Sequence, residues 1–206
     1  EAFSRGFVDA QERAAAREAA KHLEEVARIA STESDDDQAA LAALAAARLL
    51  RVLDAKAATQ LYQLALQHDP GSAEAADSLT DRLADEHRWP ELVRLVRARV
   101  AGTTDKPRAV ELHLRLADVL LHHQGDPEGA QHELEAARTQ APDDPAVHEM
   151  TAALLVTSDP SRAIAAWREV ARLAELRGDH RTGARAWAKL GDLLGSTADT
   201  AGAGTA

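Results

Sequence analysis

Apolar residues recur along most of the chain at intervals of three and four, the spacing that places side chains on one face of an α-helix. The row Val8, Ala15, Ala19, Leu23, Val26 and Ile29 follows this spacing. It predicts one long helix over residues 7–30. Residues 38–53 are apolar nearly all round, so a helix there is expected to lie sandwiched between neighbouring helices.

Proline, glycine and aspartate mark the breaks between these apolar segments, as expected at helix ends. Further helices are predicted over 55–68, 73–86, 89–100, 107–123, 127–141, 145–156, 160–177 and 180–194. Ten helices that alternate with short turns predict an all-α fold. The expected architecture is a right-handed α-solenoid of antiparallel helix hairpins.

A spacing of small and large residues recurs along the chain. Ala58, Tyr62, Ala65 and Pro70 share this spacing with Ala130, Leu134, Ala137 and Pro142. The equivalent positions Ala58 and Leu92 are 34 residues apart, and Ala130 and Ala163 are 33 apart. Such a period with one helix pair per repeat is typical of tetratricopeptide repeats.

The segment Trp187, Leu190, Gly191 and Leu194 matches the first-helix half of that repeat, with leucine in place of tyrosine. The chain therefore resembles the tetratricopeptide repeat family, with degenerate repeats of bacterial type, from about residue 38 to 194. A single array is expected over 1–195, followed by a flexible tail over 196–206. Its repeats are expected at roughly 39–72, 73–110, 111–144 and 145–183, with an incomplete one from 184 onward.

In this family the first helices line a concave groove that takes an extended peptide or a helix of another protein. The resemblance implies a binding module without chemistry. One subset clamps a carboxylate with lysine, asparagine and arginine. This chain has no asparagine, and only Arg51 and Arg115 are basic candidates on the central first helices, so that clamp is not expected.

The groove is expected to be mixed in character. Ala40, Ala43, Leu44 and Ala47 would form an apolar end, and Arg115, His122 and His123 would follow at the other end. Asp77, Asp81 and Asp85 would make its middle acidic. We therefore expect a partner segment with a basic residue near its centre. The alternative is that the three aspartates form a solvated helix face.

Composition narrows the function classes. Among 206 residues the net charge is -10, which argues against nucleic-acid binding. Cysteine is absent, and no apolar run is long enough to span a membrane. No catalytic or cofactor-binding motif is present. His113, His122, His123 and His132 lack metal-ligand spacing and are expected on the surface, whereas Trp167 and Trp187 are expected in the core.

Two functional classes remain open. The first is an interaction scaffold that forms part of a larger, multidomain bacterial protein. The alternative is a regulatory or structural section of an enzyme or signalling protein whose active domain lies elsewhere. Because the chain starts at Glu1 without methionine, we expect a fragment or a processed form. A periplasmic location therefore stays open beside a cytoplasmic one.

Overall fold

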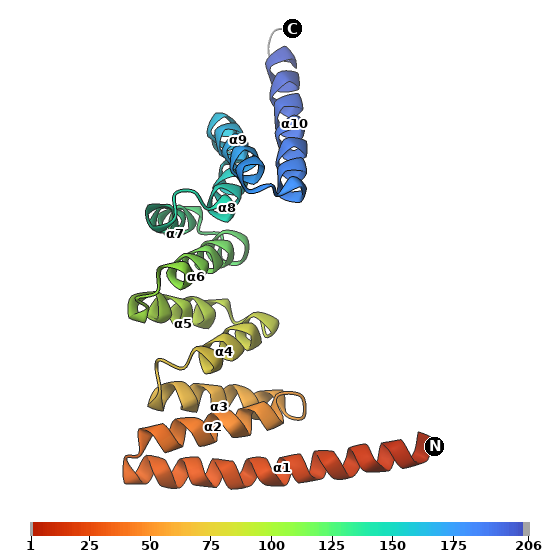
Figure 1. The fold of residues 1–206 in the computed structure, drawn as a ribbon, viewed down its shortest axis with the longest axis vertical. Helices are drawn as coiled ribbons and strands as arrows, with labels where there is room; N and C mark the ends of the chain where they lie inside the picture. The colour runs from red at the N-terminus through yellow and green to blue at the C-terminus, as the bar shows by residue number, and fades with distance from the viewer. Residues whose placement is uncertain (1, 204–206) are drawn as a thin grey trace. The chain divides into compact units, whose positions relative to one another are not determined.

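The computed structural model describes the backbone of residues 2–203 and the side chains of residues 10–196, and this part of the chain is helical (Figure 1). Its α-helices are α1 (Ala2–Glu33), α2 (Asp36–Leu50), α3 (Ala55–His68), α4 (Ala73–Asp85), α5 (Trp89–Gly102), α6 (Lys106–Val119), α7 (Pro127–Gln140), α8 (Pro145–Leu155), α9 (Pro160–Arg177) and α10 (His180–Ala203). A π-helical turn, η1 (Leu120–Gln124), follows α6. The predicted all-α fold is confirmed.

Short Gly-Asp turns end one helix and begin the next. Gly125 and Gly178 adopt φ angles of 63° and 67°, the left-handed conformation that glycine takes without steric cost. The aspartate that follows each glycine caps the next helix. The Asp126 carboxylate accepts a hydrogen bond from the Gly129 amide at 2.8 Å, and Asp179 accepts one from the Thr182 amide at 3.0 Å.

The chain forms two compact units, residues 1–88 and residues 89–206, and each is described by itself. In the first unit α2 packs between α1 and α3, and α3 packs on α4. In the second unit the pairs α6–α7, α8–α9 and α9–α10 make the most extensive contacts. The repeat boundaries expected from the sequence stay predictions.

Alanine dominates the core of the first unit. Because its side chain is small, it allows the helices that bury it to pack closely. Ala27 and Ala30 of α1 and Ala43 and Ala46 of α2 are completely buried. Tyr62 of α3 is the bulkiest side chain buried among them. The sandwiched position expected for the apolar segment at 38–53 is therefore found in α2.

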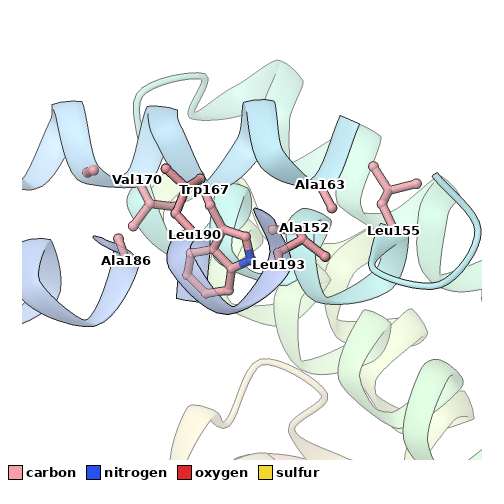
Figure 2. Packing of buried hydrophobic residues seen from close by; sticks show 9 residues of the cluster. Ala152, Leu155, Ala163, Trp167, Val170, Ala186, Leu190 and Leu193 are labelled. Atoms are coloured by element: carbon pink, nitrogen blue, oxygen red, sulfur yellow. The ribbon is translucent and has the colours of Figure 1, made fainter. Parts of the chain in front are cut away.

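The core of the second unit includes a cluster around the indole of Trp167 (Figure 2). Figure 2 shows Trp167 of α9 lying against Leu190 and Leu193 of α10. Trp167 is therefore a core residue, as its spacing predicted. The expected core position of Trp187 is wrong: its side chain is 53% exposed, and its Nε1 donates to Glu175 at 3.3 Å.

Two further expectations differ from the structure. His113 is not a surface residue: it is buried between α6 and α7, where its Nδ1 lies 2.8 Å from the Glu133 carboxylate. The helix predicted over 107–123 changes to π-helical geometry at Leu120, and His123 stacks on Trp89 with ring centroids 3.8 Å apart. The expected tail over 196–206 lies almost wholly outside the described side chains, although the α10 backbone continues to Ala203.

Candidate functional site

The outer face of α2, the first helix of its hairpin, is apolar at two exposed positions. Leu41 is 68% exposed, and Val52, two residues beyond the end of α2, is 85% exposed. Arg48 lies between them at the spacing of one helix face. Large apolar side chains left this exposed can be covered by a partner with a gain in free energy.

A row of carboxylates on α4 adjoins this face. The Arg48 guanidinium makes two hydrogen bonds to the Glu74 carboxylate, and the one from Nε is 2.5 Å long. The hydrogen bonds from Arg48, and to a lesser extent its positive charge, stabilise the ionised form of Glu74. They hold the pKa of the Glu74 carboxyl below its usual range. Asp77, Asp81 and Asp85 continue on the same side of α4, at intervals of three to four residues from Glu74.

Leu44 lies on a different face of α2 from the one expected. Its side chain is only 9% exposed, and Ala40, Ala43 and Ala47 are buried with it. This burial argues against a contact between Leu44 and a partner, since these four residues fill the core of the first unit. Leu41 takes the outward position instead, and Arg51 is exposed just after the helix.

The sequence contains one signal that identifies the outer face of α2. Beyond its first turn, Arg48 is the only charged residue of that helix. A charged side chain marks the solvent side, and Leu41, seven residues earlier, lies near that side, although Leu44, four residues earlier, has a similar spacing. The apolar pattern alone does not indicate which side of α2 faces solvent, because α2 is apolar nearly all round.

The remaining predicted residues, Arg115 and His122, belong to the second unit. Arg115 is half-buried on α6, and exposed His122 lies in η1 with its Nε2 3.7 Å from the Asp118 carboxylate. Asp77, Asp81, Asp85 and Arg51 all belong to the first unit. The expected groove residues are therefore divided between the two units.

The second unit has a groove of about 450 Å³ between α8 and α10. Trp167 of α9 lines it together with Ala153, Val156 and Leu193. The polar side chains that line it are Thr157, Lys189, Asp192 and Ser196. Sequence reasoning missed this groove, because its lining residues come from three helices and share no spacing along the chain.

A second hollow, of about 280 Å³, lies among α7, α8 and α9. Leucines such as Leu134 and Leu154 line it, together with Arg138, Glu135 and Glu169. The pKa of Glu135 is lowered by its hydrogen bond to Arg138 and, less, by the charge of Arg162. Acids and bases in this hollow thus neutralise one another, and it offers no net charge for a charged ligand.

Ser31, His68 and Asp36 form a hydrogen-bonded row across α1, α3 and α2. His68 Nε2 lies 2.8 Å from the Ser31 hydroxyl, and His68 Nδ1 lies 2.8 Å from Asp36. General base catalysis requires the serine to donate its proton to the histidine. The Ser31 hydroxyl lies as close, 2.8 Å, to the Ala27 carbonyl of its own helix, so that carbonyl competes with His68 for its single proton. The row therefore ties three helices together.

Metal-binding and membrane-spanning features were also sought within the described residues. No three side chains of histidine, aspartate or glutamate converge there as a metal site requires. No helix in that part of the chain combines the length and the apolar character that crossing a bilayer requires.

Comparison with known proteins bears on the fold. The tetratricopeptide repeat family model matches residues 102–154, and no curated protein matches the chain. Pseudomonas aeruginosa PilF is 19% identical, with 87% of this chain and 93% of that chain covered and a TM-score of 0.53. YrrB, described as a repeat protein of this kind with an unusual peptide-binding site, is 17% identical, with coverages of 81% and 91% and a TM-score of 0.51.

A double mutant of MamA from RS-1 is 14% identical, with 77% of this chain and 96% of that chain covered and a TM-score of 0.55. At such identities the likeness shows the fold alone. Together with the family match, it confirms the resemblance that the sequence motifs predicted. The fold is that of a helical solenoid.

Proposed function

We propose that this chain is a protein–protein interaction scaffold without catalytic chemistry of its own. The proposal rests on the match to the tetratricopeptide repeat at residues 102–154 and on the helix pairs of both units. Its partner is a segment of another protein, either an extended peptide or a helix. The chain acts as one part of a larger multidomain protein.

One observation carries this proposal: the exposed apolar side chains of Leu41 and Val52 flank Arg48, which binds Glu74 at the start of the acidic row of α4. An apolar partner residue that covers Leu41 removes apolar surface from water on both molecules. A basic residue of the same partner then lies near Asp81 and Asp85. The two kinds of contact require a partner that is apolar on one side and basic on the other.

The groove between α8 and α10 supports a similar role for the second unit. Its volume of about 450 Å³ lies within the range of pockets that take a ligand, and Trp167 forms part of its apolar lining. We assign to it an apolar side chain of the partner. Arg51, Arg115 and His122 stay in the proposal as polar contacts to the partner.

Peptides selected from a random display library on the immobilised chain test this proposal. Selected peptides should combine apolar and basic residues, and their affinity should fall as salt rises. Changing Asp77, Asp81 and Asp85 together to serine should weaken binding and flatten this salt dependence. Changing Asp105, Glu128 and Asp143 to serine removes the same charge elsewhere and should have little effect.

The outcome of the triple substitution at Asp77, Asp81 and Asp85 decides between the two interpretations of this row. If binding keeps its full salt dependence, the aspartates are a solvated helix face. If Leu41→Lys also leaves the affinity unchanged, the outer face of α2 is not the binding surface. Failure to select any peptide would contradict the scaffold function itself.

A further inference from the structure

Helix α1 has an exposed apolar row beside the face that packs on α2. Three of its alanines are buried in the first unit: Ala20, Ala27 and Ala30. The residue before each of them is exposed, and at 3.6 residues per turn it lies about 100° around the helix from its buried neighbour. The exposed residues, here called the α1 row, recur at intervals of four and three: Ala15, Ala19, His22, Val26 and Ile29.

No described helix of the first unit covers the α1 row. Val26 and Ile29 are 39% and 41% exposed although α2 packs on the neighbouring face. Helix α3 reaches α1 at Ser31, whose hydroxyl lies 2.8 Å from His68 Nε2. Ser31 lies about 140° around the helix from Val26, beyond the buried alanines. The row is therefore open to a partner that removes its apolar surface from water.

The length of α1 indicates that the covering element is a helix. Helix α1 has 32 residues and α2 has 15, and Figure 1 shows α1 continuing beyond the end of α2. No side chain of residues 10–19 is buried. A helix without tertiary contacts is only marginally stable in water. Because the row follows helical spacing, the ridges of a second helix can pack along it and stabilise this part of α1.

The charges of α1 are separated between its two sides. The cations of residues 10–33 all lie about 140° or more around the helix from Val26: Arg13, Arg17, Lys21 and Arg28. Four glutamates lie within about 100° of Val26 and border the α1 row: Glu12, Glu18, Glu25 and Glu33. Only Glu24 lies on the cationic side. The border of the row is therefore acidic along its whole length.

We propose that the α1 row binds a basic amphipathic helix of another protein. Glu25 lies 2.6 Å from Arg28, whereas Glu12, Glu18 and Glu33 have no ion-pair partner among the described side chains. Arginine or lysine at the edges of the partner helix supplies the opposite charge. The α1 row of a second copy would instead bring glutamates against glutamates, so the acidic border disfavours self-pairing.

The α1 row also sets the shape of the partner helix. Ala15 and Ala19 are small and leave room for large apolar side chains of the partner, whereas Val26 and Ile29 project and favour small ones. All the residues of this surface belong to α1 of the first unit. The proposal therefore does not depend on the surface formed by α2 and α4.

Two synthetic helical peptides test this proposal on the full chain. The basic probe, of about 20 residues and so about 30 Å long, has leucines at intervals of three and four with arginine on both borders of the leucine row. The acidic probe has glutamate in place of every arginine. Fluorescence anisotropy of the labelled probes measures both affinities. The basic probe should bind, more weakly as salt rises, and the acidic probe should bind at least about tenfold more weakly.

Variants of α1 locate the contact. Val26→Gln with Ile29→Gln should weaken the basic probe about tenfold or more, because the apolar contact is lost. Glu18→Gln with Glu33→Gln should weaken it about threefold or more and flatten the salt dependence. Glu24→Gln with Glu128→Gln removes the same charge away from the row and should have little effect. Glutamine favours helix, so circular dichroism should show unchanged helix content in all three.

Four results would overturn the proposal. The first is that neither probe binds, and the second is that both bind equally well. The third is that Leu41→Lys abolishes binding of the basic probe, because the probe then occupies the outer face of α2. The fourth is self-association of the wild type, measured by sedimentation equilibrium, that Val26→Gln with Ile29→Gln abolishes, because a second copy then covers the row.

Discussion

At the scale of single residues, the pair of His113 and Glu133 shows where local pattern is a poor guide. Both side chains are buried, although histidine and glutamate are usually exposed. They come from α6 and α7 and satisfy each other through one hydrogen bond of 2.8 Å. Their spacing along the chain is not helical, so nothing in the sequence linked them.

Substitution at Glu133 should distinguish a lost hydrogen bond from lost packing. Glu133→Ala leaves His113 buried without its partner and should lower the free energy of unfolding by about 1–3 kcal/mol. Glu133→Gln keeps a hydrogen-bonding oxygen at nearly the same place and should cost less. Urea unfolding of both variants measures the difference. Equal losses in the two variants would contradict the hydrogen bond.

Trp187 and Leu41 show the same limit for apolar residues. Helical spacing indicates that a residue shares a face with others, but it does not indicate whether a neighbour covers that face. Trp187 follows the repeat motif and yet is half exposed. Leu44 and Leu41 belong to the same apolar helix and both lie at helical spacing from Arg48, so only their burial in the structure tells which of them points outward.

At the scale of the elements, the sequence predicted most helix bounds to within about three residues. Proline, glycine and aspartate made this possible, because each acts locally on backbone conformation and on the unpaired amides of a helix start. The π-helical turn at Leu120–Gln124 was missed. The turn contains His123, which stacks on Trp89 from α5, a contact that no local sequence motif indicates.

The small residues of α7 test the assigned register of the repeats. Ala130 and Ala137 are completely buried. Ala130→Leu adds three carbon atoms to this closed contact and should destabilise the protein by about 1–3 kcal/mol. Thermal unfolding measures this loss, with Ala98→Leu on the exposed side of α5 as the matched control. An unchanged melting temperature for Ala130→Leu would contradict the assigned register.

At the scale of the whole molecule, each of the two units carries one candidate binding surface among its described residues. The first unit offers Leu41, Val52 and the carboxylates of α4, and the second offers the groove beside Trp167. The sequence predicted the acidic row but not the groove. A groove between helices depends on how side chains from separate segments meet. The periodicity within one segment does not predict those contacts.

Hydrogen exchange of the chain with and without a selected peptide tests the central claim most directly. Contact on the first helices of the first unit predicts slower exchange in α2 and in residues 74–85 of α4, with α3 and α7 unchanged. Protection of α2 and α4 that disappears in the Asp77, Asp81 and Asp85 serine variant would support the proposed surface. Protection confined to the second helices α3, α7 and α9 would contradict it.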